Sequence, residues 1–162
     1  MSEIKLVPMT KALTHKFFQG FETDPCTYAN MEDFKPYVYD KEWVKGYFMH
    51  HRIIGNVSLA VMLSNEPIGE VVLKKIDNEK RECTLGIHLK NDNYKNKGIG
   101  TKAIRLALQY AFNEMNMLAV NADSILKNTR SQHVLEKVGF KHIGEDDTNK
   151  YYRCEKSDFK CE

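Results

Sequence analysis

The strongest constraint on the fold is a strand, a glycine-containing turn and a long helix that follow one another. From Glu82 to Leu89 apolar residues alternate with other residues, which is the pattern of a strand whose two faces differ. From Thr101 to Met115 an apolar stripe recurs at helical spacing, with no glycine or proline inside. A strand that leads into a helix of this kind indicates a fold in which helices pack against a sheet.

The remaining segments predict a mixed α+β order of elements. The pattern from 57 to 89 is strand-like and is interrupted by polar turns, which indicates an antiparallel meander of three strands. A strand–helix–strand crossover follows, and a hairpin comes near the end of the sequence. Strands are expected at 4–7, 57–63, 68–76, 83–89, 117–122, 140–144 and 150–154, and helices at 10–21, 41–51, 101–115 and 128–138.

The segment 26–40 fits neither a helix nor a strand. It contains Pro36 and several aromatic residues that follow no period. Long irregular segments of this kind are commonly functional. We therefore expect a structured loop that covers a binding site, with the aromatic residues Tyr28, Phe34, Tyr37 and Tyr39.

Length and composition narrow the class of protein. A chain of 162 residues fits one compact domain, so residues 1–162 are expected to form a single domain. Lysine and arginine total 24 against 22 aspartate and glutamate residues, a balance that favours neither a nucleic-acid nor a membrane partner. Four scattered cysteines without ligand spacing argue against a metal site and a disulfide framework. With no leader-like pattern at Met1 to Pro8, a cytoplasmic protein is expected.

The turn between the strand and the long helix has the properties of an anion site. It presents backbone N–H groups at the positive end of the helix, and glycine lets a phosphate approach that backbone closely. The sequence lacks the third glycine of a dinucleotide fingerprint and the Gly-Lys-Ser/Thr of a P-loop. A purely structural turn is the alternative interpretation. The turn reads Lys95-Asn96-Lys97-Gly98-Ile99-Gly100 and is followed by Thr101.

This turn and a segment further along the chain resemble the GNAT family of N-acetyltransferases. The family's pyrophosphate turn reads Q/R-x-x-G-x-G/A, and Lys95 stands here in place of Gln or Arg. Downstream, Asn128, Ser131 and the run Glu136-Lys137-Val138-Gly139-Phe140 are similar to the family's N-x-x-A/S…E-K-x-G-F segment. The form is closest to the ribosomal-protein alanine acetyltransferase (RimJ/RimL-like) branch. The resemblance covers 68–154 well and the first third of the chain only loosely.

The resemblance implies a GNAT fold, a mixed central sheet flanked by helices whose fourth and fifth strands splay apart. The pantetheine arm of acetyl-CoA would lie between these strands, bonded to the main chain of Ile87, His88 and Leu89. Asn128 at the mouth of this slot would hydrogen-bond the pantetheine, although its position also suits a helix N-cap. The pyrophosphate would be held by Lys95, Asn96, Lys97, Gly98, Ile99, Gly100 and Thr101.

The implied activity is transfer of an acetyl group from acetyl-CoA, as cosubstrate, to a primary amine by direct attack in a ternary complex. The acceptor is a small-molecule amine or a protein N-terminus. Similar proteins are often dimers, so a homodimer is compatible with this resemblance. Acids in the first third are candidates to line a cleft for a cationic amine, namely Glu22, Asp24, Glu32 and Asp33.

The departing thiolate needs a proton, and the residue that many GNAT enzymes use for it is absent. Those enzymes place a tyrosine seven residues after the motif asparagine, where this chain has Leu135. The RimJ/RimL-like branch offers a serine three residues after the asparagine, which corresponds to Ser131. We expect Ser131 to hydrogen-bond or protonate the sulfur. The alternative is that Ser131 is only a solvent-facing residue in the first turn of a helix.

The residue that takes the proton from the amine also departs from the family pattern. The RimJ/RimL-like branch uses a glutamate where this chain has Thr84, and a threonine is not a base near neutral pH. Glu70 and His88 are the preferred candidates, and Glu82 on the same strand as His88 is a further one. Any of them either accepts the proton directly or orders a water that carries it away.

Two other functions are compatible with these departures. A CoA-binding domain that has lost catalysis would act as a sensor or interaction module, and this is motivated by Leu135 and Thr84. In the other, the glycine turn is only structural and the protein binds no nucleotide. Binding without thiol release would favour the first, and a lack of thermal stabilisation by CoA would favour the second.

Overall fold

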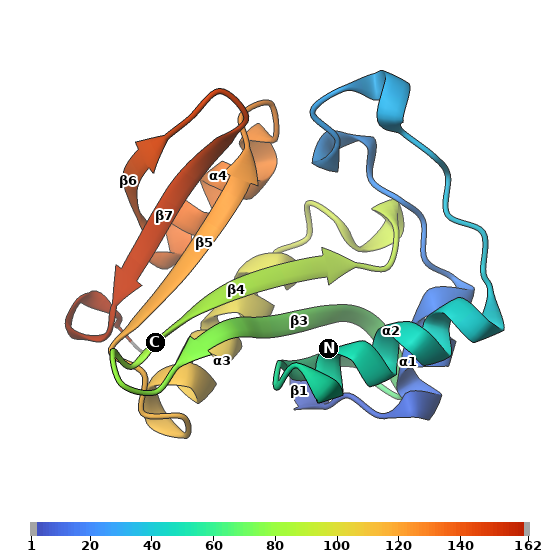
Figure 1. Ribbon diagram of the computed structural model, residues 1–162, viewed down its shortest axis with the longest axis horizontal. Helices are drawn as coiled ribbons and strands as arrows, with labels where there is room; N and C mark the ends of the chain where they lie inside the picture. Colours follow the sequence, from blue (N-terminus) through green and yellow to red (C-terminus); the bar gives the residue numbers. More distant parts are fainter. Residues whose placement is uncertain (1–2, 161–162) are drawn as a thin grey trace.

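The computed structural model describes residues 3–160, and its centre is a seven-stranded sheet in the order β1-β2-β3-β4-β5-β7-β6 (Figure 1). Neighbouring strands are antiparallel except for β4 and β5, which run parallel. The predicted mixed α+β architecture and its three-strand meander, β2-β3-β4, are confirmed. The strands are β1 (Ile4–Pro8), β2 (Val57–Leu63), β3 (Glu66–Asp77), β4 (Glu82–Leu89), β5 (Ala119–Ile125), β6 (Lys141–Glu145) and β7 (Asn149–Glu155).

Helices cover both faces of this sheet. Val71 and Leu85 belong to the core cluster that contains the apolar stripe of α3 and residues of α4. Glu70 lies on the opposite face, since successive strand residues alternate, and it bonds to Tyr47 of α2. The first two helices therefore lie on one face and the last two on the other. The helices are α1 (Lys11–Gln19), α2 (Lys41–Ile53), α3 (Ile99–Asn113) and α4 (Thr129–Val138).

The helix ends follow from local capping residues. Thr10 accepts a hydrogen bond from the N–H of Leu13 at 3.1 Å and begins α1, as expected. Asp40 does the same for α2, where its carboxylate accepts from the second and third residues of the helix. Gly139 ends α4 in the left-handed conformation, with φ of +118°, as its place after the apolar pattern predicts.

Several predicted boundaries, among them the following two, differ from the structure by one to three residues. The long helix begins at Ile99, two residues early, because Gly98 rather than Gly100 is its N-cap. The following strand is β5, which begins at Ala119 instead of 117, because the N–H of Met117 donates to the carbonyl of Ala111 and belongs to the turn after α3.

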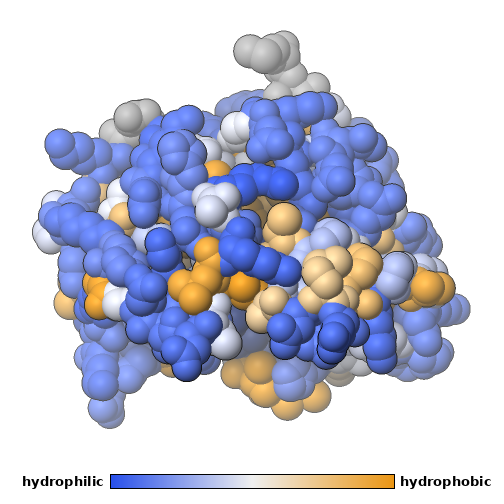
Figure 2. Space-filling model, turned by 90° about the horizontal axis from the view of Figure 1, so that it is seen from above, coloured by the Kyte–Doolittle hydropathy of each residue, from blue (hydrophilic) through white to orange (hydrophobic). Residues whose placement is uncertain are grey.

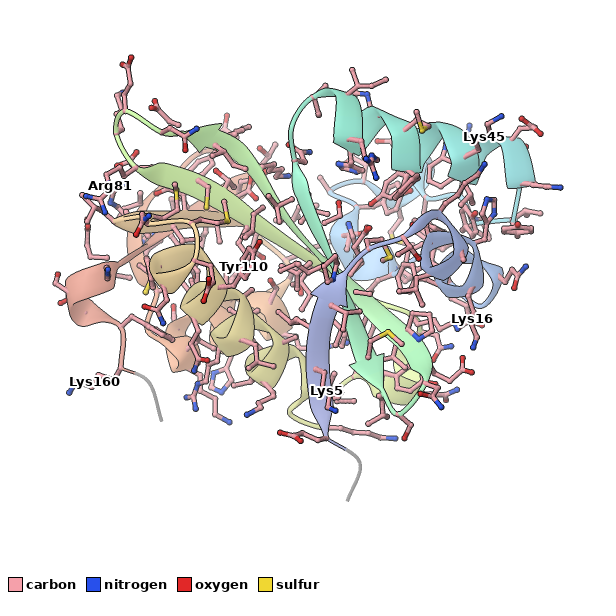
Figure 3. The ribbon with its side chains drawn as sticks, turned by 90° about the horizontal axis from the view of Figure 1, so that it is seen from below. Lys5, Lys16, Lys45, Arg81, Tyr110 and Lys160 are labelled. Atoms are coloured by element: carbon pink, nitrogen blue, oxygen red, sulfur yellow. The ribbon has the colours of Figure 1, made fainter. Side chains whose placement is uncertain are left out.

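Most charged side chains lie on the outside of the molecule, and buried Glu70 is an exception. The lysines labelled in Figure 3, among them Lys5, Lys16 and Lys45, project outward from different elements. Lys16 forms an exposed ion pair of 2.9 Å with Glu66, a kind of pair that contributes little stability. Within residues 3–160 no helix is long and apolar enough to span a bilayer. The described cysteines are free thiols, and Cys161 lies outside the described residues.

Candidate functional site

The sheet contains a slot where β4 and β5 separate. The two strands pair only from Glu82 with Ala119 to Thr84 with Asn121. Beyond that point β4 continues along β3 as far as Leu89, while β5 continues along β7 (Figure 1). The facing edges of β4 and β5 therefore leave a slot that widens toward the carboxyl ends of both strands, as the resemblance implied.

The edge of β4 that faces this slot carries unpaired backbone groups. Lys90, just after β4, donates its N–H to the carbonyl of Ile68 at 2.7 Å, so this residue directs its backbone toward β3. Backbone direction alternates along an antiparallel strand, which turns the N–H groups of Leu89 and Ile87 toward the slot. These are donors that an extended ligand arm lying in the slot can use.

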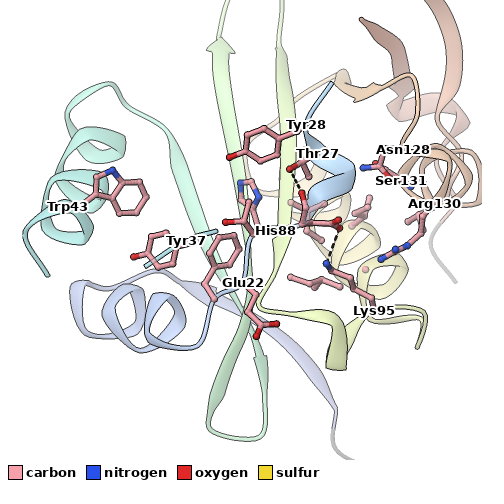
Figure 4. Close-up of a pocket in the computed structure, with 18 residues that line it drawn as sticks. Glu22, Thr27, Tyr28, Tyr37, Trp43, His88, Lys95, Asn128, Arg130 and Ser131 are labelled. Atoms are coloured by element: carbon pink, nitrogen blue, oxygen red, sulfur yellow. Dashed lines mark hydrogen bonds and ion pairs between the residues drawn. The ribbon is translucent and has the colours of Figure 1, made fainter. Parts of the chain in front are cut away.

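A cavity of about 440 Å³ occupies the slot and extends to the loop that follows α1 (Figure 4). Figure 2 views the molecule from above and shows apolar residues near the middle of a face that is otherwise hydrophilic. Of the residues expected to bind the cofactor, the cavity is lined by Ile87, His88, Leu89, Lys95, Gly100, Asn128 and Ser131. The others, Asn96, Lys97, Gly98, Ile99 and Thr101, belong to the same turn and do not line the cavity.

One end of the cavity lies at the N-terminus of α3, and we call it the phosphate end. Gly98 is the N-cap in the left-handed conformation, with φ of +78°, and no described side chain caps this helix. The first backbone N–H groups of α3 are therefore free to bind an anion. A Cβ atom placed on Gly98 or Gly100 would meet no atom of residues 3–160 within 4 Å, so none of these residues fills the space in front of the turn.

Lys95 links the phosphate end to the loop after α1. Its Nζ contacts Asp24 Oδ2 at 2.9 Å and Asp92 Oδ1 at 2.8 Å, and its side chain is only 11% exposed. Burial opposes the charge of Lys95, but the bonds to Asp92 and Asp24 outweigh burial and raise its pKa. The ammonium group is thus already engaged by two carboxylates.

Arg130, in the first turn of α4, is the cation that sequence reasoning missed. It lines the cavity beside Lys95 (Figure 4), and its guanidinium makes no hydrogen bond or ion pair with the described residues. It acts on Asp24 only through a longer-range charge interaction. Its position, two residues after Asn128 in a helical first turn, is the signal by which it could have been found.

The start of α4 is held rigidly by its own residues. Asn128 caps the helix by accepting the N–H of Ser131 at 3.2 Å, so the N-cap interpretation is confirmed. Buried Gln132 donates to the carbonyls of Ile125 and Leu126 at 3.0 and 2.9 Å and fixes the loop before the helix. Leu135 is part of the apolar core, so its side chain packs inside the protein and does not line the cavity.

His88 lies on β4 and reaches the cavity through its side chain. Its ring stands edge-on to Phe21, with centroids 6.4 Å apart. The residue is exposed to solvent, and it lines the cavity. Burial lowers the pKa of His88, and the charges of Lys74 and His51 lower it further. The imidazole is therefore neutral at pH 7 and able to accept a proton.

Glu70 lies outside the large cavity. It is 1% exposed, accepts a hydrogen bond from the hydroxyl of Tyr47 and lines a smaller cavity of about 170 Å³. Burial raises its pKa to about 7, and the bond from Tyr47 opposes this only in part. Glu82, the further candidate, forms an ion pair with Arg153 and does not line the large cavity either.

The other end of the large cavity is built from aromatic side chains, and we call it the aromatic end. Sequence reasoning had expected the 26–40 loop to cover a binding site but had not identified which rings would face it. No period connects them, because they come from the segment after α1, the 26–40 loop and α2. The rings that line this end are Phe21, Tyr28, Tyr37 and Trp43.

Of the four acids expected near a cationic acceptor, two line the cavity and two do not. Glu22 and Asp24 line the cavity, whereas Glu32 and Asp33 lie exposed on a short 3-10 turn, Met31–Asp33, outside it.

The chain matches the acetyltransferase (GNAT) domain family over residues 3–141, which is most of its length. A 48-residue segment is 44% identical to a Bacillus subtilis (strain 168) protein named "Probable N-acetyltransferase YjcK". This segment is 30% of the chain and 26% of that protein, so the match spans about a quarter of the relative.

Solved structures with the same fold include spermidine N-acetyltransferases. A chimera of the Vibrio cholerae enzyme SpeG and hSSAT is 20% identical, with a TM-score of 0.77, and the match covers 96% of this chain and 97% of that one. The dodecameric Vibrio cholerae spermidine N-acetyltransferase gives a TM-score of 0.72 at 20% identity, with 95% and 94% covered. At this identity the likeness shows a shared fold.

Proposed function

Because this chain belongs to the acetyltransferase (GNAT) domain family and is therefore an acetyltransferase, we propose that it transfers an acetyl group from acetyl-CoA to a primary amine. The observation that carries the proposal is one continuous cavity that joins an uncapped helix N-terminus to a ring-lined end by way of the slot between β4 and β5. A cosubstrate and an acceptor can thus meet in the slot, as direct attack in a ternary complex requires.

Acetyl-CoA fits the features of the phosphate end and the slot. The N–H groups at the start of α3 and the guanidinium of Arg130, which pair with no side chain of the described residues, suit its phosphates. The backbone groups of Ile87 and Leu89 suit an extended arm, and Asn128 lies at the mouth of the slot. When bound, acetyl-CoA supplies an activated acyl group. A backbone N–H of β4 is placed to stabilise the negative charge that develops on the acyl oxygen.

His88 is the residue best placed to take the proton from the amine. It lines the cavity between the aromatic end and the slot, and its lowered pKa keeps it neutral. Ser131 lines the same cavity from α4 and is placed to hydrogen-bond the departing sulfur.

The role of Glu70 is indirect, because it lies outside the large cavity. It stands opposite His88 in the register of β3 and β4, so the two side chains leave the same face of the sheet. It faces the smaller cavity, which is lined by Tyr47, His51 and Asn56 among others. A water ordered there would lead the proton from the site toward solvent.

The test is an assay of CoA thiol release from acetyl-CoA with small amines, amino acids, polyamines and N-terminal peptides. Thiol release that requires an amine supports the proposal. Acetyl-CoA binding without release against any amine would instead support the CoA-binding sensor. An absence of both would leave the glycine turn with a structural role only.

A His88→Gln variant tests the proton acceptor. We expect kcat to fall by about 10² to 10⁴, a typical contribution of general base catalysis. In the native protein kcat/KM rises with pH through a pKa below 6.5, because His88 must be neutral to act. That rise should vanish in His88→Gln, while calorimetry should give an unchanged affinity for acetyl-CoA. A pH profile that keeps its acid limb in the variant would exclude His88.

A further inference from the structure

The aromatic end contains a row of rings that leads to the site of chemistry. Trp43 and Tyr37 have ring centroids 5.6 Å apart, and Tyr37 and Phe21 have centroids 5.4 Å apart. The row ends at His88, 6.4 Å from Phe21. These separations are typical of favourable aromatic pairs. A flat apolar group that joined this row would therefore bring an attached amino group toward His88.

Trp43 keeps much of its surface free for such a group. It lies in the first turn of α2, where its inner side stacks on Tyr47 at 5.3 Å, and it remains 49% exposed. Large exposed apolar surface in a concave site is a common mark of a ligand contact. Figure 4 shows Trp43 and Tyr37 on the side of the cavity opposite Lys95 and Arg130.

The charges in the cavity suit a ligand with a single positive charge. Asp24 is paired with Lys95, and Glu70 lies in the smaller cavity. Glu22 is the acid on the lining that makes no ion pair with the described residues. A polyamine would thus meet one uncommitted carboxylate, and its further ammonium groups would approach the cations Lys95 and Arg130.

We propose that the acceptor is a monoamine whose amino group is joined by a short chain to an aromatic ring that lies against Phe21, Tyr37 and Trp43. This inference rests on the proposed function, because it assumes that the aromatic end receives the acceptor. It differs from what the spermidine N-acetyltransferases of the same fold act on, and it makes the rings of the segment after α1, the loop and α2 the determinants of specificity.

Binding can be measured without catalysis, because Trp43 is the single tryptophan of the chain. With CoA present, Trp43 emission excited at 295 nm is followed as 2-phenylethylamine, butylamine or spermidine is added. We expect a saturable change with 2-phenylethylamine at concentrations where the other two amines give none. A saturable change with spermidine at lower concentration would overturn the proposal, as would equal responses to 2-phenylethylamine and butylamine.

Kinetics give the second measurement. We expect kcat/KM for 2-phenylethylamine to exceed the values for butylamine and spermidine by about 10-fold or more, the effect of one well-packed ring. Trp43→Ala should raise the KM for 2-phenylethylamine about 10-fold with an unchanged KM for acetyl-CoA, and Trp43→Phe should restore part of the loss. Met49→Ala is the matched control, since Met49 is exposed on the same helix outside the cavity.

The fluorescence and kinetic results together distinguish a failure of the proposed aromatic acceptor from a failure of the proposed acetyl transfer. Fluorescence binding of the aromatic amine without any thiol release would contradict the proposed function and leave the ring site in place. Thiol release with spermidine as the best acceptor, or a Trp43→Ala variant with native kinetics, would contradict the ring site and leave the acetyltransfer in place.

Discussion

The phosphate end and the aromatic end of the large cavity are built from different parts of the chain. At the phosphate end the groups that face the ligand are mostly backbone amides, at the start of α3 and along the edge of β4. At the aromatic end they are side chains from three segments, such as Phe21, Tyr37 and Trp43. Backbone amides are the same in every sequence, whereas side chains are not. The phosphate end is therefore suited to a constant ligand, and the aromatic end to one that differs between proteins.

The largest effect is expected from filling the phosphate end. Gly98→Glu places a side chain and a negative charge where the phosphates would lie, and it strains a residue with φ of +78°. We expect the Kd for acetyl-CoA to rise at least about 1,000-fold, equivalent to about 4 kcal/mol. Titration calorimetry measures this directly. If the affinity survives, the phosphate end is not where the pyrophosphate binds.

Two further variants test whether Gly98→Glu weakens binding by filling the phosphate end, by straining the backbone or only by adding a charge to the protein. Gly100→Glu fills the same space from a helical position that requires no positive φ, so it should also abolish binding. Gly46→Glu adds the same side chain to the exposed face of α2, where a Cβ meets nothing within 4 Å, and should bind acetyl-CoA normally.

The stability of the protein should depend on pH through Glu70, which accepts a hydrogen bond from Tyr47 beside the aromatic end. The folded protein raises the pKa of Glu70 from 4.5 to about 7, so between these values the unfolded chain loses a proton that the folded state keeps. The free energy of unfolding should therefore decrease as pH rises through this window, by about 3 kcal/mol in total for this carboxyl. Glu70→Gln cannot ionise and should lack that decrease.

The measurement is urea unfolding of native and Glu70→Gln protein at pH 5 and pH 8. The difference between the two proteins cancels the other titrating groups. Tyr47→Phe is the matched variant, since it removes the hydrogen bond that lowers the pKa of Glu70 and should shift the decrease to higher pH. Parallel curves for native and Glu70→Gln protein would show that Glu70 is not held protonated.

The smallest effects are expected at Asn128, where two variants distinguish helix capping from acetyl-CoA binding. Asn128→Ala removes an N-cap and should cost about 1 kcal/mol of stability. Asn128→Asp keeps the capping oxygen, so we expect stability within about 0.5 kcal/mol of native, whereas the loss of the amide group should weaken acetyl-CoA binding about 10-fold. Thermal unfolding and calorimetry measure the two quantities. An Asp variant with native affinity would limit Asn128 to capping.

Much of the fold and the phosphate end could be predicted because their signals are local. The periods that define β2, β3 and β4 are contained in single segments, and so is the turn from Lys95 to Gly100. The N-cap oxygen of Asn128 and the left-handed Gly139 act on residues within one helical turn. Such features are fixed by neighbouring residues, so sequence alone indicates them.

The aromatic end and the pairing of Lys95 depend on tertiary contacts that no local pattern contains. Lys95 meets Asp24, which is 71 positions away in the chain. Phe21 falls within the helix predicted at 10–21, but α1 ends at Gln19, and Phe21 lies beyond the helix and lines the cavity. Glu70 and His88 stand opposite each other on β3 and β4, so their side chains leave the same face of the sheet. Tyr47 of α2 contacts Glu70, and the alternation of residues along β3 does not predict that contact.

The separation of β4 and β5 also creates two strand edges in the interior of a sheet. Beyond Thr84 as far as Leu89 on β4, and from Ala122 to Ile125 on β5, the two strands are not paired with each other. Unpaired strand edges are templates for strand addition and aggregation. A ligand arm in the slot would cover the edge of β4 as an extra strand does. Saturation with its cosubstrate should therefore protect this protein from self-association as well as prepare it for catalysis.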